Sequence, residues 1–311
     1  MELVPRVAAG ETAAIARLMA RAEAVSEEVR PALGEIYRQA GRAHLIGVTG
    51  PPGSGKSTLV GRLIGRLRAM DRRVAVVAVD PSSPYSGGAI LGDRLRMNEH
   101  SEDPGVFIRS LATGGMGGGL SRAALDLGDI LDVAGFDVVI FETVGTGQDE
   151  VDVARASHTT IVVSAPGLGD GIQAIKAGIL EVADVHVVSK TDRSDAMATL
   201  ADLAVMLDRQ PKRPDGWRVP ALGVSSVSGE GLDALVESLD QHRAAFAGPA
   251  GDARRTGIAA FRIARTAEAL LRERFATLPP DGVERSVAAR DLDPYAAAAR
   301  RVRSFMGEDD A

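Results

Sequence analysis

The sequence predicts an α/β fold in which a mostly parallel β-sheet is flanked by helices, with further helical segments at both ends of the chain. Short apolar runs alternate with segments of helical periodicity, which is the pattern of parallel strands joined by crossover helices. A glycine-rich octapeptide stands between the first such run and the first such helix. With 311 residues, 45% of them hydrophobic, the chain is long enough to bury the core of such a sheet.

Three regions are expected along the chain. Residues 1–43 carry apolar side chains at helical spacing and form an N-terminal helical extension, and residues 44–248 contain the alternating pattern. Beyond Gly248 the composition changes, so residues 249–311 are expected to form a C-terminal helical arm. The strands expected in the middle region are His44–Thr49, Val74–Val79, Val106–Ile108, Val138–Phe141, Thr160–Val163, Val185–Val188 and Val219–Val224.

The composition excludes several classes of protein. The chain has no cysteine, which excludes disulfides and thiolate metal sites, and its five histidines form no ligand cluster in the sequence. A net charge of −6 argues against a general nucleic-acid-binding protein. No apolar run reaches the length of a membrane span, and the N-terminus lacks the apolar region of a signal peptide. We therefore expect a cytoplasmic protein that binds neither nucleic acid nor membranes.

The octapeptide Gly50–Ser57 fits the pattern G-x-x-x-x-G-K-[ST] of phosphate-binding loops, known as P-loops. Its glycines allow the backbone N–H groups to point at phosphate oxygens, and the following helix adds the positive end of its dipole. Lys56 is expected to reach the outer phosphates and Ser57 to ligate Mg²⁺. An ordinary glycine-rich turn is the alternative, but a strand before and a helix after are the context that the motif requires. The expected nucleotide contacts are Gly50, Pro51, Pro52, Gly53, Ser54, Gly55, Lys56, Ser57 and Thr58.

Acidic residues near the ends of later strands are candidates for the metal and the attacking water. Asp80 follows one apolar strand, and Glu142 follows another in the arrangement called Walker B. Asp93 lies in a long glycine-rich connection and would approach the metal only if that loop closes. Gly145 would let the backbone approach the γ-phosphate, and Gln148 is a candidate for orienting a water, with a plain surface glutamine as the alternative. The expected catalytic residues are Lys56, Asp80, Asp93, Glu142 and Gln148, and the expected Mg²⁺ ligands are Ser57, Asp80, Asp93 and Glu142.

Two segments indicate recognition of guanine. Ser189-Lys190-Thr191-Asp192 follows an apolar strand and resembles the guanine-reading pattern N-K-x-D, with Ser in place of Asn. Asp192 would accept from the N1–H and the exocyclic amine of guanine, which adenine does not offer, while the Lys190 stem covers the base. After the next strand, Ser225, Ser226 and Val227 begin a tight loop that would present a backbone N–H to guanine O6. Together the segments favour GTP and GDP as the ligands.

With these motifs in hand, the chain resembles the MeaB/ArgK family of P-loop GTPases over roughly residues 10–306. Members of this family are chaperones of adenosylcobalamin-dependent acyl-CoA mutases such as methylmalonyl-CoA mutase. The segments 79–83 and 87–94 look like the first switch of the family, and 142–148 looks like the second. Asp170, Gln173 and Lys176 look like parts of a third switch, which in this family relays the nucleotide state to the mutase.

The resemblance implies a Mg²⁺-dependent GTPase that hydrolyses GTP slowly alone and faster with its partner. Its implied role is to gate cofactor loading and to protect or reactivate the mutase. The family also implies a homodimer through the C-terminal helices, with a helical hairpin folded back on its own domain as the alternative. Two other functions stay open: an ATP-using kinase of the ArgK amino-acid transport type, and a nickel-insertion GTPase, which the lack of cysteine disfavours.

Overall fold

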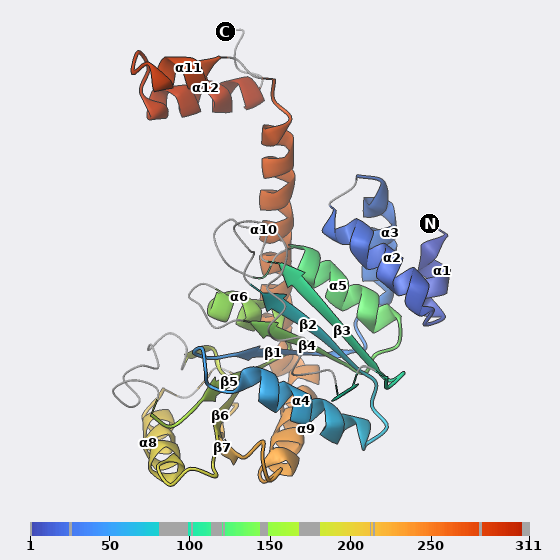
Figure 1. The fold of residues 1–311 in the computed structure, drawn as a ribbon, viewed down its shortest axis with the longest axis vertical. Helices are drawn as coiled ribbons and strands as arrows, with labels where there is room; N and C mark the ends of the chain where they lie inside the picture. Colours follow the sequence, from blue (N-terminus) through green and yellow to red (C-terminus); the bar gives the residue numbers. More distant parts are fainter. Residues whose placement is uncertain are drawn as a thin grey trace. The chain divides into compact units, whose positions relative to one another are not determined.

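A computed structural model describes residues 2–24, 27–80, 99–100, 102–112, 120, 122–143, 149–167, 181–211, 213, 215–279 and 282–306. The chain divides into two compact units, Met1–Arg262 and Ile263–Ala311. The first unit contains a seven-stranded sheet in the order β3-β2-β4-β1-β5-β6-β7, in which every neighbouring pair is parallel (Figure 1). The predicted fold class is therefore confirmed. The strands are β1 (His44–Thr49), β2 (Val74–Asp80), β3 (Val106–Ala112), β4 (Val138–Thr143), β5 (Thr159–Ser164), β6 (Val185–Ser189) and β7 (Ala221–Val224).

Helices of the first unit flank this sheet, and the described part of the second unit is helical. In the first unit they are α1 (Leu3–Ala8), α2 (Thr12–Glu23), α3 (Arg30–Gln39), α4 (Lys56–Arg68), α5 (Arg122–Val133), α6 (Asp149–Ala156), α8 (Ala196–Asp208) and α9 (Leu232–Ala247). The helix α10 (Asp252–Ala276) begins in the first unit, and the second unit also holds α11 (Val283–Ala288) and α12 (Pro294–Met306).

Six of the seven strands differ in length from their sequence predictions, by one or two residues in every case except β3. β3 continues beyond Ile108 to Ala112 because its parallel pairing with β2 persists to that residue. β7 begins at Ala221 rather than at Val219. Proline has no N–H to donate to a ladder, so Pro220 suits the position just before a strand. Its carbonyl still accepts a hydrogen bond from the backbone N–H of His186 at 2.9 Å.

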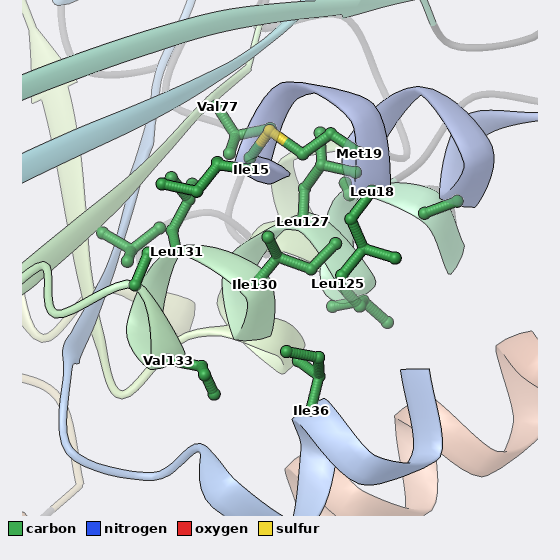
Figure 2. Close-up of a cluster of buried hydrophobic side chains, with 14 of the residues drawn as sticks. Ile15, Leu18, Met19, Ile36, Val77, Leu125, Leu127, Ile130, Leu131 and Val133 are labelled. Carbon is green, nitrogen blue, oxygen red and sulfur yellow. The ribbon is translucent and has the colours of Figure 1, made fainter. Parts of the chain in front are cut away.

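Alternate residues of the strands face two separate cores, as expected for a sheet covered on both sides. In β2, Val76 packs in the core that α4 and α9 share with the sheet, whereas its neighbour Val77 packs in the core of α1, α2, α3 and α5. Figure 2 shows this second core, where Val77 lies near Ile15 and Met19 of α2 and Leu131 of α5. The N-terminal helices thus bury their apolar stripe within the first unit.

The edge of the sheet where β5 and β6 begin holds a buried charge network. Asp184, which is fully buried, pairs with Arg254 at 2.7 Å, with Arg213 at 3.1 Å and with His242 at 3.4 Å. It also accepts a hydrogen bond from the backbone N–H of Thr160 at 2.8 Å. Burial alone would raise the pKa of Asp184, but the hydrogen bond with His242 and the charges of Arg254 and Arg213 lower it to about 2.

We predict that Asp184→Asn lowers the free energy of unfolding by about 3 kcal/mol at neutral pH, because it removes the buried anion that pairs with Arg254 and one of the two anions that pair with Arg213. The carboxylate of the native protein should stabilise the fold by about 2 kcal/mol above its unfolded pKa near 3.9, and this contribution is lost as the pH falls toward 2. The measurement is urea unfolding followed by fluorescence of Trp217, the single tryptophan, whose indole N–H donates to the Asp184 carbonyl at 2.8 Å.

A matched control for this prediction is Asp215→Asn, because Asp215 also pairs with Arg213, at 3.1 Å, but lies partly exposed. Asp215→Asn should lower the free energy of unfolding by less than about 1 kcal/mol. If the two variants lowered the free energy of unfolding by the same amount, burial of the Asp184 carboxylate would not determine how much it stabilises the fold.

The second unit, Ile263–Ala311, contains the later part of α10 together with α11 and α12. The rings of Phe275 and Phe305 lie 6.0 Å apart, and the Arg301 guanidinium lies over Phe275 at 5.8 Å. Arg301 also donates a hydrogen bond to Glu284 at 2.7 Å, which links α12 to α11. Within the described part of the chain, no helix combines the length and the apolar composition needed to cross a membrane.

Candidate nucleotide site

The candidate site lies at one edge of the sheet, where the described strands end. Because all the strand pairs are parallel, their carboxyl ends share this edge, which is where open α/β sheets bind ligands. β1 lies between β4 and β5, so the segment after β1 has the ends of both strands beside it. The ends of β6 and β7 follow on the β5 side of the sheet. The fold thereby brings together sequence motifs that lie far apart in the chain.

The loop Gly50–Gly55 has a backbone that only glycine adopts easily at several positions. Gly50, Gly53 and Gly55 have φ values of 141°, 78° and 91°. A Cβ atom on Gly50 would lie 2.1 Å from the carbonyl oxygen of Val163 in β5, so a side chain cannot fit there. The predicted spacing of glycines therefore has two physical causes: the positive φ values of the turn, and the close approach of the loop to the neighbouring strand.

Lys56 is the first residue of α4, and its side chain lies against the loop that precedes it. Only 6% of the residue is exposed. Its Nζ donates hydrogen bonds to the carbonyl oxygens of Gly50 at 2.8 Å and Pro51 at 3.1 Å. The ammonium group is thus held over the opening residues of the loop, where the positive end of the helix dipole adds to its charge. This is an arrangement suited to binding an anion.

Ser57, in the first turn of α4, contacts Glu142 near the end of β4. The Ser57 hydroxyl donates to Glu142 Oε1 at 2.6 Å, and the two residues are 7% and 3% exposed. The register of the sheet sets this contact, since Glu142 is the partner of Val48 in β1, close to the start of the loop. A hydroxyl and a carboxylate oxygen are the hard donors that Mg²⁺ prefers, so the pair fits such an ion.

Ser189 and Lys190 connect the end of β6 to the phosphate-binding loop. The Ser189 hydroxyl lies 2.5 Å from the Ser54 carbonyl oxygen and 3.1 Å from that of Ser164. Lys190 has a left-handed backbone, with φ of 58°, and its Nζ donates to the Gly53 carbonyl at 2.9 Å. The serine that departs from the N-K-x-D pattern therefore joins this segment to the loop.

Asp192 is held by the loop that follows β7. The Ser225 hydroxyl donates to Asp192 Oδ1 at 3.0 Å and accepts from the backbone N–H groups of Val227 at 3.3 Å and Ser228 at 3.2 Å. The N–H of Ser225 itself donates to the Glu230 carbonyl at 3.0 Å. Among the residues that the structure describes, the N–H of Ser226 donates to no acceptor, unlike its neighbours in the loop.

Several predicted site residues stay predictions. Asp80 ends β2, and the register places this end beside β4, where Val79 is the partner of Thr143. Thr58 lies in the first turn of α4. The remaining predicted residues lie outside the described part of the chain, and they are Asp93, Gly145, Gln148, Asp170, Gln173 and Lys176.

Sequence reasoning missed one residue at this edge, Arg62 of α4. Its Nε donates to the Ser226 carbonyl at 2.7 Å, in the loop predicted to contact the base. An arginine on an exposed helix surface carries no sequence signal of its own, because its partner lies far along the chain.

Comparison with known proteins agrees with the geometry of the site. Residues 13–278 match the model of a family described as methylmalonyl Co-A mutase-associated GTPase MeaB. The chain is 41% identical to a Pyrococcus horikoshii protein assigned as a GTPase, over 98% of each chain. It is 34% identical to the mitochondrial methylmalonic aciduria type A homolog of mouse, over 84% of this chain and 65% of that protein. The crystal structure of a LAO/AO transport system kinase superposes with a TM-score of 0.73 at 26% identity, covering 98% of this chain and 97% of the other.

Proposed function

The chain belongs to the MeaB family of methylmalonyl-CoA mutase-associated GTPases, and on that premise we propose that it acts as a G-protein chaperone of an adenosylcobalamin-dependent acyl-CoA mutase. As a GTPase it binds guanine nucleotide and converts GTP to GDP and phosphate. In the proposed role, its nucleotide state gates the loading of cofactor onto the mutase and the protection or reactivation of that enzyme. The family description and the mouse relative, a methylmalonic aciduria protein, support this partner.

The observation that carries the proposal is the direct link between the base-reading segments and the phosphate-binding loop. Ser189 and Lys190 contact carbonyl groups of that loop, and Asp192 is fixed by Ser225. In the proposed complex, Asp192 accepts from guanine N1–H and the exocyclic amine, while the N–H of Ser226 donates to O6. Lys56 and the N–H groups of the loop bind the phosphates.

Mg²⁺ is proposed to bind at Ser57 and Glu142, whose oxygen atoms lie 2.6 Å apart in a buried position. Asp80 and Asp93 are proposed to complete its surroundings. When bound, the ion would neutralise charge that develops on the phosphate oxygens during hydrolysis. Ser57 contributes from the first turn of α4, which follows the phosphate-binding loop, and Glu142 from the end of β4, the sheet neighbour of the strand that precedes the loop.

Hydrolysis is proposed to be slow until a partner completes the site. Gln148 is the proposed water-orienting residue, and Asp170, Gln173 and Lys176 are the proposed relay to the mutase. These residues come from glycine-rich segments that follow β4 and β5 in the sequence. Contact with the mutase in one nucleotide state would fix them in position, which is how partner proteins accelerate GTP hydrolysis in general.

A homodimer through the C-terminal helices is also proposed. Large apolar side chains of the second unit are exposed in the single chain, including Leu271 at 55%, Tyr295 at 89% and Met306 at 62%. Apolar side chains gathered on exposed helices are typical of surfaces that another chain covers.

The test of the proposed function is capture of purified acyl-CoA mutases, the methylmalonyl-CoA enzyme first, on the immobilised protein loaded with GDP or with a non-hydrolysable GTP analogue. We expect the amount captured to differ by at least about fivefold between the two nucleotides, since a coupling of about 1 kcal/mol produces such a factor. Equal capture in both states would contradict the gating role, and the protein without nucleotide provides the baseline.

A second candidate is an ATP-using kinase, because the superposed structure is titled a transport system kinase. The carboxylate of Asp192 argues against this function, because it suits the N1–H and amine of guanine and would repel the unprotonated N1 of adenine. Calorimetric titration with GTP and with ATP distinguishes the two, and tighter binding of ATP would favour the kinase.

A further inference from the structure

We propose that Arg62 is a positioning residue for guanine recognition, which holds the loop Ser225–Gly231 against α4 so that the N–H of Ser226 faces the O6 atom of the base. The inference rests on the proposed guanine site. It adds a residue that the motif comparison does not include, on the helix that otherwise serves the phosphates.

The geometry of the loop supports this role. Arg62 donates from Nε to the Ser226 carbonyl oxygen at 2.7 Å, a hydrogen bond assisted by the guanidinium charge. Among the described residues, most of the other hydrogen bonds of the loop involve Ser225, which contacts Asp192, Val227, Ser228, Gly229 and Glu230. Ser226 is therefore held from outside by Arg62, at the residue whose own N–H is proposed to read O6.

Fixing the carbonyl of Ser226 restricts the backbone of the residue that carries the proposed donor. The Ser225 carbonyl accepts from the N–H of Gly229 at 2.9 Å and the Ser226 carbonyl accepts from Arg62, so both peptide groups that flank the Ser226 Cα are constrained. An oriented N–H gives a hydrogen bond of good geometry to O6 without the entropic cost of ordering the loop on binding. Val227, the next residue, is 79% exposed and offers little packing to replace that constraint.

The position of Arg62 on α4 also links the two halves of the proposed site. The same helix begins with Lys56 and Ser57, the proposed phosphate and Mg²⁺ residues. A contact from this helix to the base loop keeps the phosphate and base subsites at a fixed separation. Because GTP and GDP carry the same base, the loss of Arg62 should weaken both nucleotides alike.

Arg66 supplies a matched control on the same helix. It pairs with Asp233, in the first turn of α9 just after the loop, and both side chains are largely exposed. Arg66 therefore ties α4 to the same region of the chain without contacting the loop carbonyl. An effect of Arg62 on loop geometry should be absent from Arg66→Ala, whereas a general loosening of α4 from α9 should appear in both variants.

The experiment measures dissociation constants of GDP, IDP and 6-thio-GDP by calorimetry for the wild type, Arg62→Ala and Arg66→Ala. IDP lacks the exocyclic amine but keeps O6, and 6-thio-GDP replaces O6 by sulfur, a weaker acceptor, while keeping N1–H. We expect Arg62→Ala to weaken GDP and IDP about fivefold, the upper range for a solvent-exposed charged contact, and 6-thio-GDP less than about twofold. Arg66→Ala should leave all three within about twofold.

Equal weakening of GDP and 6-thio-GDP by Arg62→Ala, or no weakening of GDP, would overturn the inference. Arg62→Lys keeps a charged donor and should recover part of the affinity, and it carries the test if the alanine variant fails to fold. Failure of the proposed function itself looks different: the wild type would then bind ADP as tightly as GDP. If the wild type distinguishes GDP from 6-thio-GDP and Arg62→Ala keeps that ratio, only the role of Arg62 is wrong.

Discussion

Asp192→Asn should transfer the base preference of the protein from guanine to xanthine, changing the ratio of GTP to XTP turnover by about 10⁴-fold. Guanine presents an N1–H and an amine to the carboxylate, so the asparagine amide would face the guanine amine with a donor and lose a hydrogen bond there. Xanthine carries a carbonyl oxygen in place of that amine and accepts from the asparagine. Once the bound base covers this position, a polar group left without its partner causes the large discrimination.

The variant should remain folded, because the asparagine carbonyl still accepts from the Ser225 hydroxyl that contacts Asp192 at 3.0 Å. The measurement is kcat/KM for GTP and XTP with matched enzyme preparations. Asp195→Asn is the control, since Asp195 is nearby in sequence but pairs with Arg193 on the surface, and its base preference should not change. A variant of Asp192 that still prefers GTP would show that this carboxylate does not read the base.

Lys56→Ala should lower GTP turnover about thousandfold at saturating nucleotide, because charge stabilisation supplies most of the catalysis of phosphoryl transfer. The ammonium is almost fully buried against the loop, and the substitution also removes its hydrogen bonds to Gly50 and Pro51. Lys56→Arg should not rescue turnover, since a planar guanidinium does not fit where the compact ammonium lies.

Lys190→Ala separates phosphate chemistry from nucleotide binding. Lys190 contacts Gly53 of the same loop, but from the base side. Its loss should raise KM about tenfold and leave kcat within about threefold, as for an interaction made equally in the ground and transition states.

Turnover of Lys56→Ala close to that of the wild type would contradict the proposed role of the P-loop lysine.

The sheet and the phosphate-binding loop were predictable because their causes are local. Buried parallel strands require apolar runs, and the loop requires glycines at the positions that have positive φ or touch Val163. The end of β3 was not predictable from local pattern: Arg109 interrupts the apolar run, yet the strand continues while Arg109 pairs with Glu23 of α2 at 2.8 Å.

Long-range contacts were also beyond the reach of sequence patterns. Ser189 reads as a departure from the guanine motif, but in the fold its hydroxyl contacts Ser54, 135 residues earlier. The pairing of Asp184 with Arg254 depends on where α10 begins relative to the sheet, and the contact of Arg62 with Ser226 depends on how α4 lies beside the loop. Such pairs are fixed by the packing of whole elements, which no local spacing encodes.

Steady-state GTP turnover with and without the mutase tests most directly whether the site works as a switch for a partner. The protein at fixed concentration is titrated with purified acyl-CoA mutase in Mg²⁺ and GTP, with the Lys56→Ala variant as the background. If contact with the mutase completes the site, basal GTP hydrolysis should be slow, and saturating mutase should raise the rate of hydrolysis at least about tenfold. Basal turnover that already equals the rate with every acyl-CoA mutase tested would contradict that account.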